Sequence, residues 1–454
     1  MSAAPVHHVY RYAHPSFVVA GARPRLTLAT SISEAGAGAH FFEGQMLAPR
    51  LVGELLSAVH LVVGSRFFTP ANTVSRILAL ADPVVTAGGG LLRFEGFSAC
   101  CSTYVRVDLL PTAYDGQVIG TGTTNVDFNA PMRAALAGVR DENGLQLSVG
   151  PEAVGLRSGA TEVIERKVEL PTRWIRGMVE VQSCQSAMRR RLECTGVEAL
   201  RFLRTLPKAS TSRTPLWVAA GPAGLFTTTR PVDRGVRLTD ARRLRVLEAL
   251  LPKAQTLSVY ADDTQQASAW VVDCGTARLT LALSAEVWRG FSGEGQALRA
   301  LLQAATRGAP MLARVRSALH WQPRLDARQL ANELGLGVAE VTDALHVLGA
   351  CGLAGFDVTD GHYFHRVLPL DLSAVDDMHP RLADAKALLD ANAVTVLKAE
   401  PFEATVRSGE LSHRVRETAG ELHCTCPWFA AHRGQRGPCK HVLAAEASRT
   451  TGQH

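Results

Sequence analysis

The chain has no long hydrophobic run. Its most apolar helical candidate, residues 51–63, is interrupted by Glu54 and His60 and is shorter than the roughly 20 residues that a membrane-spanning helix needs. Residues 1–13 contain two histidines and an arginine where a signal peptide would have an apolar core. We therefore expect a cytoplasmic protein that makes no membrane contact.

The sequence also lacks the short motifs of common enzyme classes. It has no phosphate-binding P-loop, no His-Glu-x-x-His metal motif, no Gly-x-Ser-x-Gly nucleophile turn and no carboxylate cluster suited to a second metal. No Lys-Ser/Thr pair follows the glycines at 88–90, so a hairpin turn is expected there. The prediction is a protein that is not an enzyme and takes no small-molecule substrate.

A disulfide framework is not expected either. The chain has nine cysteines, and six of them are scattered: Cys100, Cys101, Cys184, Cys194, Cys274 and Cys351. Scattered cysteines in a long cytosolic chain usually act as small buried hydrophobic side chains.

The length of 454 residues exceeds what one hydrophobic core supports, so we expect an α+β multidomain protein. Five segments are predicted: an N-terminal α+β domain (1–130), an α+β region with a basic zone (131–296), a winged-helix-like domain (297–370), a linker with one helix (371–391) and a zinc module of strands followed by a helix (392–448).

The remaining three cysteines form a compact motif near the end of the chain. Cys424 and Cys426 are two residues apart, and after 12 residues Cys439 and His441 repeat that spacing. Three thiolates and an imidazole are ligands that a tetrahedral zinc ion favours. Residues two apart share one face of a strand but not of a helix, so Cys439 should precede a helix and His441 should lie in its first turn. With four protein ligands, one structural Zn²⁺ is predicted.

This motif resembles the SWIM zinc finger. The similarity includes Pro-Trp-Phe at 427–429, directly after the second cysteine, and Cys-Lys-His-Val-Leu-Ala at 439–444. It extends over roughly residues 392–448 and implies a short β-meander followed by a helix. It also implies a partner that is DNA or protein. SWIM modules occur beside chromatin-remodelling-type ATPases, so an accessory role in a larger ATPase-containing complex is a further implication.

Positive charge is concentrated in the middle of the chain. The net charge is +6, but residues 185–253 alone hold 14 Lys and Arg against 5 Asp and Glu, a local excess of +9. Such a zone suits a polyanion, and solvated helix faces are the alternative. We expect helices at 188–206 and 241–251 to present the cations to DNA: Arg189, Arg190, Arg191, Arg201, Arg204, Arg242, Arg243 and Arg245.

Three further cations lie around the zinc motif, namely Arg433, Arg436 and Lys440. A Zn²⁺ ion with three thiolates carries a charge of −1. These side chains therefore either neutralise the site or contact phosphate, and the sequence favours neither role.

The middle of the chain also contains what we interpret as a diverged internal duplication. Each copy reads as a helix, three strands and a Trp-centred turn, with the strand at 145–149 matching 256–260 and Trp174 matching Trp288. Chance similarity of two short stretches is the alternative. Repeated α+β modules with basic helices are similar in architecture to DNA sliding clamps, although no clamp motif is present.

Residues 311–366 resemble a winged helix-turn-helix. Asp326 is expected to cap a helix at 327–334, and a glycine turn leads to a second helix at 338–348 and a hairpin. This second helix has no Lys or Arg, and it would present Glu340 and Asp343 to the phosphates. DNA reading needs cations and amides, so we predict a packing or protein-contact module.

The sequence thus predicts a non-enzymatic zinc protein that engages DNA through its basic centre, assisted by the zinc module. The alternative is a protein–protein adaptor or an accessory subunit of an ATPase-containing complex.

Overall fold

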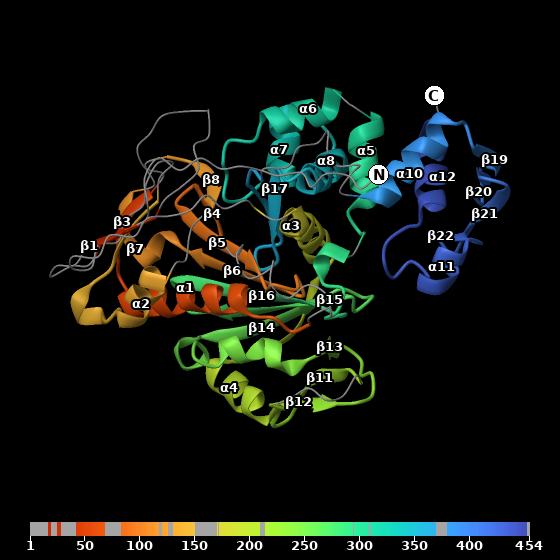
Figure 1. Cartoon of the computed structure of the whole chain (residues 1–454). Helices are drawn as coiled ribbons and strands as arrows, with labels where there is room; N and C mark the ends of the chain where they lie inside the picture. The colour runs from red at the N-terminus through yellow and green to blue at the C-terminus, as the bar shows by residue number, and fades with distance from the viewer. Residues whose placement is uncertain are drawn as a thin grey trace.

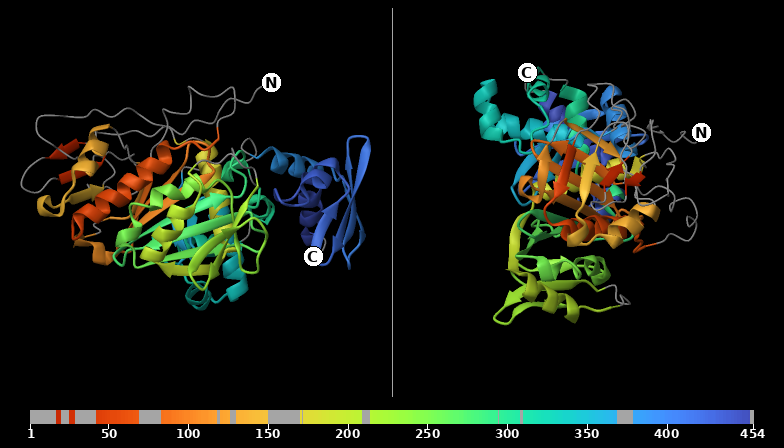
Figure 2. Two further views of the ribbon diagram at one scale, coloured as in Figure 1. Left: turned by 90° about the horizontal axis from the view of Figure 1, so that it is seen from below. Right: turned by 90° about the vertical axis from the view of Figure 1, so that its left-hand side faces the viewer.

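The computed structural model describes residues 17–19, 25–28, 42–68, 83–117, 120–125, 130–149, 170, 172–208, 214–293, 295–307, 310–368 and 379–451. They form a mixed α/β protein with several sheets, in which a large body carries a C-terminal module on one side (Figures 1 and 2). No helix in these ranges is long and apolar enough to cross a membrane.

An antiparallel sheet of eight strands forms the centre of the body. Its order is β10-β14-β15-β16-β6-β5-β4-β8. The strands are β4 (Val84–Gly88), β5 (Leu91–Phe97), β6 (Thr103–Leu109), β8 (Gly122–Asn125), β10 (Arg189–Thr195), β14 (Thr256–Ala261), β15 (Ala267–Asp273) and β16 (Ala277–Ser284). The sheet contains strands from both sides of residue 130, where a domain boundary is predicted, and they share one hydrophobic core.

The two faces of this sheet differ in chemistry because side chains alternate along each strand. One face of β5 packs against α1 (Pro49–Gly64), so closely that a Cβ at Gly96 would lie 2.6 Å from Val63. The other face carries charged side chains from β5 and β6 that lie under the helical part of the body. This second face joins parts of the chain that are far apart in sequence.

The charged face holds a buried network of three cations and three anions: Arg93, Arg106, Arg366, Glu95, Asp108 and Asp357. Each residue is at most 3% exposed. The guanidinium of Arg93 also lies 3.8 Å from the ring centroid of Phe364. Equal numbers of opposite charges leave the network neutral, which is the condition under which ionised groups tolerate burial.

The helical part of the body follows the predicted order of elements. Its helices and hairpin strands are α5 (Leu298–Arg307), α6 (Pro310–Ser317), α7 (Ala327–Leu334), α8 (Val338–Ala350), β17 (Ala354–Asp357) and β18 (His362–His365). Asp326 caps α7 by accepting from the N–H of Arg328 at 2.8 Å, and Gly335, with φ +61°, ends this helix. The assignment as a winged helix stays an interpretation.

Helix α8 is largely a packing element. Val347, Ala350 and Cys351 at its C-terminal end lie in a core cluster that includes Val179 of α3 (Thr172–Ser186) and residues of α5. Only its first turns are exposed, where Glu340 and Asp343 lie. This position agrees with the prediction of a packing or protein-contact helix.

A second sheet of five strands, in the order β1-β2-β9-β3-β7, lies at the N-terminal side. Its strands are β1 (Phe17–Val19), β2 (Arg25–Leu28), β3 (Phe42–Met46), β7 (Tyr114–Gln117) and β9 (Gln146–Val149), and α2 (Ala130–Gly138) packs on α1. The predicted duplication is not confirmed, because β9 lies in this sheet whereas its proposed counterpart β14 lies in the larger one. Most of the first copy's middle part, residues 150–169, is outside the described residues.

The basic zone forms a lobe at the β10 edge of the large sheet, which we define as residues 189–253 and name the basic lobe (Figure 1). It contains β10, α4 (Gly196–Thr205), β11 (Leu216–Gly221), β12 (Gly224–Thr228), β13 (Val236–Leu238) and short 3₁₀ turns. The helix predicted at 188–206 is wrong for its first half, since residues 189–195 pair with β14 as a strand. The helix predicted at 241–251 is a 3₁₀ helix at Ala241–Leu247 and a second 3₁₀ turn at Leu251–Lys253.

The C-terminal module, residues 394–451, is a four-stranded antiparallel sheet backed by helices. It contains β19 (Val394–Lys398), β20 (Glu403–Ser408), β21 (Leu411–Thr418), β22 (Glu421–Cys424), α11 (Pro427–His432) and α12 (Lys440–Thr451). The predicted hairpin and third strand are present, with β19 as an additional edge strand. Helix α10 (Pro380–Asp390) connects the module to the body and packs against α12.

Candidate metal centre

The four predicted ligands meet at one point of the C-terminal module. The ligand atoms of Cys424, Cys426, Cys439 and His441 all lie within 4.8 Å of one another, and all four residues are buried. Cys424 ends β22, Cys426 caps α11, and Cys439 directly precedes α12, whose first turn holds His441. The last two positions are the ones that the spacing predicts. Sequence and geometry therefore agree on the ligand set.

Backbone N–H groups surround the three sulfur atoms. The N–H of Phe429 lies 3.3 Å from Cys426 Sγ, the N–H of Val442 lies 3.4 Å from Cys439 Sγ, and that of Cys426 lies 3.4 Å from Cys424 Sγ. Such donors stabilise thiolates and hold their orientation. The loop and both helix starts thus present sulfur atoms prepared for a cation.

The imidazole of His441 faces the sulfurs through Nδ1, which lies 3.8 Å from Cys424 Sγ. Its ring packs on that of His413, with centroids 4.3 Å apart. The other nearby histidines point elsewhere: His423 packs on Phe429 and His432 on Trp428. The prediction that neither of these two is a ligand agrees with this geometry.

Hydrogen bonds between the thiols move the pKa values of Cys439 and Cys424 in opposite directions. Hydrogen bonds from Cys424, His441 and the Val442 N–H lower the pKa of the Cys439 thiol to about 4, against the effect of burial. The hydrogen bond to Cys439 raises the pKa of the Cys424 thiol, as burial also does. Three sulfurs and one nitrogen in this arrangement fit tetrahedral Zn²⁺, and they leave no position for a substrate.

Residues 418–449 match the SWIM zinc finger family model. The matched segment contains all four ligands, and one structural Zn²⁺ fits it. No curated protein matches the chain. Among solved structures, the proliferating cellular nuclear antigen from Entamoeba histolytica and A. fulgidus PCNA with the C-terminal region of FEN-1 bound are similar at 10% identity, with a TM-score of 0.34. Each alignment covers 54% of this chain; it covers 98% of the Entamoeba histolytica chain and 97% of the A. fulgidus chain.

The SWIM finger is fastened to the body by Arg381 of α10. Its guanidinium donates to the carbonyl oxygens of Arg436, at 2.7 Å, and Pro438, at 3.0 Å, and it covers the ring of Trp428 at 4.7 Å. These acceptors lie in the insert between the two ligand pairs. Arg381 thus holds the metal-binding loop against α10.

The same insert touches the body directly. Arg436 donates to the carbonyl oxygen of Gly293 at 3.3 Å, and the Cα of Gly437 is so close to Gly295 that a Cβ would lie 2.1 Å from the Gly295 oxygen. In addition, Arg299 of α5 pairs with Glu446 of α12 at 2.7 Å. These contacts hold the SWIM finger against the segment that leads into α5 and against α5 itself.

The cations predicted around the finger therefore differ in role. Arg436 and Lys440 are engaged within the protein, since Lys440 pairs with Asp384 at 3.1 Å, whereas Arg433 is exposed. Burial lowers the pKa of His432, and so do the neighbouring Arg436, Arg289 and Arg381.

The eight arginines of the basic lobe that are predicted to contact nucleic acid fall into two groups, exposed and less exposed. Arg189, Arg190, Arg201, Arg204 and Arg242 are exposed. Three of these have carboxylate neighbours: Glu193 for Arg190, Glu248 for Arg204 at 3.8 Å and Asp240 for Arg242 at 2.5 Å.

The other three are less available. Arg191 pairs with Asp263, and Arg245 donates to the carbonyl oxygen of Leu206 at 2.6 Å. Arg243 is 1% exposed and donates to two buried carbonyl oxygens, at 3.0 and 2.8 Å. It is a core residue, and the predicted phosphate contact is wrong at this position.

Sequence reasoning missed Arg381, which fixes the finger to the body. Nothing in the local pattern identifies it, because its acceptors lie 55 and 57 residues further along the chain. It also missed Lys208, Arg230 and Arg234 of the basic lobe, all exposed. Their place in the basic zone was the available signal, but they lie outside the stretches predicted to be helical.

Proposed function

We propose that this protein is a non-enzymatic, zinc-stabilised protein that binds nucleic acid through its basic lobe, with the SWIM finger in an assisting role. The observation that carries the proposal is the concentration of charge: the described residues of the basic lobe hold 13 Lys and Arg against 5 Asp and Glu, an excess of +8. A clustered field of this kind attracts the phosphate backbone whatever its sequence.

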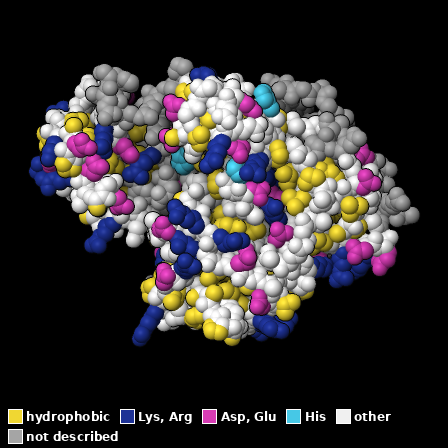
Figure 3. Space-filling view, turned by 180° about the vertical axis from the view of Figure 1, so that it is seen from behind, with side chains coloured by type: hydrophobic (Ala, Val, Ile, Leu, Met, Phe, Trp, Pro, Cys, Tyr) yellow, Lys and Arg dark blue, Asp and Glu magenta, His cyan; other side chains and the backbone are white. Residues whose placement is uncertain are grey.

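The exposed cations of the lobe come from different elements, which spreads the field over a surface instead of a single helix. Arg189 lies on β10, Arg201 on α4, Lys208 after α4, and Arg230 and Arg234 between β12 and β13. Figure 3 shows Lys and Arg side chains around the lower edge of the molecule, where the lobe lies. Acidic side chains are interspersed there, so the expected binding is moderate and salt-sensitive.

The proposal does not include insertion of α8 into the DNA major groove as a recognition helix. The exposed turns of α8 present Glu340 and Asp343 without a cation, and its remaining length packs inside the body. The SWIM finger supplies Arg433 as an exposed cation and contributes mainly through its fixed attachment to the body.

The test is a salt series of DNA binding, measured by fluorescence anisotropy with single- and double-stranded oligonucleotides. Each phosphate neutralised contributes about −0.9 to the slope of log K against log salt on duplex DNA. We expect a clear negative slope that becomes shallower when Arg189, Arg201 and Lys208 are all changed to alanine.

The matched control changes three exposed cations outside the lobe to alanine, namely Arg328, Lys398 and Arg407. It should leave the slope unchanged. A slope near zero for the wild-type protein would contradict the proposal.

A protein-adaptor role is the second candidate, and the exposed acidic start of α8 favours it. Recovery of a stable protein partner that is lost on changing Glu340 and Asp343 to lysine, with DNA binding absent, would support this role in place of the first.

A further inference from the structure

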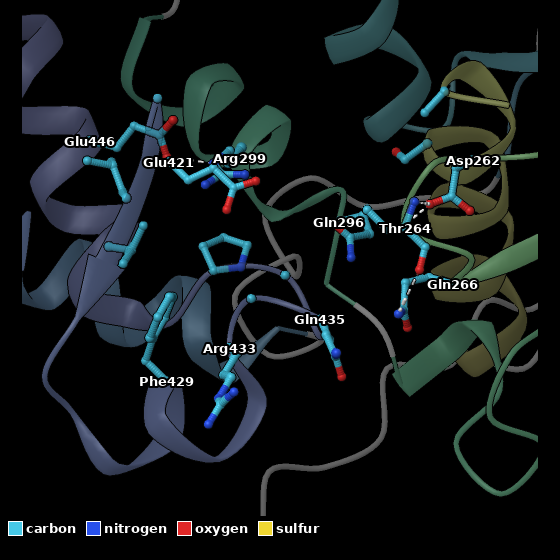
Figure 4. A pocket seen from close by; sticks show the side chains of 18 of the residues that line it. Asp262, Thr264, Gln266, Gln296, Arg299, Glu421, Phe429, Arg433, Gln435 and Glu446 are labelled. Carbon is cyan, nitrogen blue, oxygen red and sulfur yellow. Dashed lines mark hydrogen bonds and ion pairs between the residues drawn. The ribbon is translucent and has the colours of Figure 1, made fainter. Parts of the chain in front are cut away.

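Beside the contacts that fasten the SWIM finger to the body, a cleft of about 760 Å³ lies between the two (Figure 4). Its volume lies within the ~300–1,000 Å³ of typical ligand sites. One wall is formed by β22, Phe429 and the insert around Gln435, and the other by the turn at 262–266 and by Gln296. Figure 4 shows Gln296 and Gln435, one from each wall, near the middle of the view. Of its lining residues, the function proposed above uses Arg433.

The strand β22 is the edge of the four-stranded sheet. It contributes Glu421 and Leu422 to the cleft lining, and the turn before it contributes Gly420. The N–H of Thr425 bonds to the carbonyl of Arg414 on β21 at 3.1 Å. Along an antiparallel pair, alternate residues direct their backbone groups to the neighbouring strand. Leu422 is therefore out of phase with Thr425, and its N–H and C=O point to the open side.

No strand among the described residues pairs with β22 on that side. An open strand edge offers backbone donors and acceptors to another extended chain. The opposite wall supplies side-chain amides, from Gln266 and Gln296, which can donate to and accept from peptide groups. The two walls together present hydrogen-bonding groups to both edges of an inserted strand.

The charges of the cleft favour a cationic occupant. Seven charged side chains line it, and four of them form pairs: Arg299 with Glu446 at 2.7 Å, and Arg449 with Glu417 at 3.1 Å. Of the other three, Asp262 is 9% exposed and accepts hydrogen bonds from Thr264, so Glu421 and Arg433 are the exposed charges. The lining as a whole has a net charge of −1. This balance disfavours a polyanion and suits a lysine or arginine next to Glu421.

We propose that the cleft binds an extended peptide segment of a partner protein, which adds to β22 as a fifth strand and places a basic side chain near Glu421. The backbone of Leu422 supplies the strand contacts, and Phe429 offers an apolar surface for a neighbouring side chain. This inference does not depend on nucleic-acid binding, since the basic lobe and the cleft share no residue.

The experiment selects ligands for the zinc-loaded full-length protein from a displayed library of random peptides about ten residues long, enough to cover β22 and the cleft beyond it. Selected peptides are then synthesised, and their affinities are measured by fluorescence anisotropy. We expect enrichment of peptides with a lysine or arginine, and weaker binding to the Glu421→Arg variant.

The backbone contact is tested with a matched pair at one position. Leu422→Pro removes the outward N–H and should weaken binding by about tenfold, the effect of one lost hydrogen bond of 1.4 kcal/mol. Leu422→Ala keeps this N–H and should bind more tightly than Leu422→Pro. Zinc content of both variants is measured, because Cys424 is two residues away.

A variant on the opposite wall, Gln296→Trp, fills the cleft without altering the finger and should also reduce binding. The proposal is overturned if no peptide is enriched, or if selected peptides bind Leu422→Pro and Gln296→Trp as tightly as the wild type. The cleft would instead be assigned to nucleic acid if a single-stranded oligonucleotide competed with the peptides and if its own binding were weakened by Gln296→Trp.

Discussion

The guanidinium of Arg381 lies 2.7 Å from the carbonyl oxygen of Arg436. This bond connects the helix that leaves the body with the loop that carries the metal ligands, so the position of the SWIM finger and the integrity of its zinc site are mechanically coupled. The first two predictions concern this coupling.

Replacing Arg381 with alanine removes two hydrogen bonds and the cation–π contact with Trp428. Since hydrogen bonds to charged groups contribute about 1.5–3 kcal/mol, we expect the free energy of unfolding in urea to fall by ~1–3 kcal/mol. Arg407→Ala, at an exposed site, should change it by less than ~0.5 kcal/mol. Equal unfolding curves for the two variants would show that Arg381 does not fasten the finger.

Zinc removal should unfold the C-terminal module and leave the body folded. The small core of the module depends on the metal, whose binding can supply ~10–16 kcal/mol to the folding of such units. We expect one zinc per chain by metal analysis, and rapid proteolysis within residues 394–451 after chelation or in Cys439→Ser. Arg407→Ala serves as the zinc-replete control. A protease-resistant module without zinc would contradict the structural role.

Loss of one charge from the buried network should be severe. Asp357 is 3% exposed; burial would raise the pKa of its carboxyl, but Arg106 and Arg93 hold it well below its usual range. Asp357→Asn leaves two cations with one partner fewer, and we expect a loss of about 3–5 kcal/mol in stability. The control Asp360→Asn, on the same turn, removes a half-exposed pair with Arg278 and should cost less than ~1 kcal/mol.

The protein should lose stability as pH falls below neutrality. Burial, with the neighbouring His320, lowers the pKa of His365 to about 4. Burial, with Arg176 and Arg381, lowers the pKa of His379 to about 3, against about 6.5 for either group in an unfolded chain. Between these values the unfolded state binds more protons, so the stabilisation is complete above pH ~6.5 and is lost as pH falls toward 4. We expect Tm to decrease over this range.

The variant His365→Gln isolates the effect. It lowers stability at neutral pH, because the His365 ring accepts a hydrogen bond from the backbone N–H of Trp321 at 2.8 Å and stacks on the Trp321 indole. Its Tm should nevertheless change less with pH than that of the wild type. An unchanged pH dependence would assign the acid sensitivity to other groups, such as the zinc ligands.

The metal centre was predictable because all its geometry is local. Two short spacings decide which strand and which helix start can present the ligands, and no distant contact is needed. The turn chemistry around α7 was predictable for the same reason, since Asp326 and Gly335 mark the two ends of that helix in the sequence.

Strand β10 shows where local reasoning failed. Three consecutive arginines favour a helix by propensity, but pairing with β14 places them on a strand. A signal was present: Thr195 and Glu198 form a capping box that starts α4 at Gly196.

The body is held together by ion pairs between residues far apart in the chain, which no local sequence pattern predicts. Arg366 meets Glu95 across 271 residues, and Arg93 meets Asp357 across 264. In sequence these are ordinary surface-type residues. Alternation along β5 places Arg93 and Glu95 on a covered face, and the hairpin of β17 and β18 brings Asp357 and Arg366 to them.

Strand β10 has a consequence for crowded conditions. The open edge of a sheet can pair with the same edge of a second copy, and two features of β10 oppose such pairing. The register of β10 shifts between Arg190 and Leu192, which bends the hydrogen-bonding edge, and two copies approaching edge to edge would bring their exposed Arg189 and Arg190 together. The same arginines that give the lobe its charge should therefore keep the protein from forming fibrils through this edge.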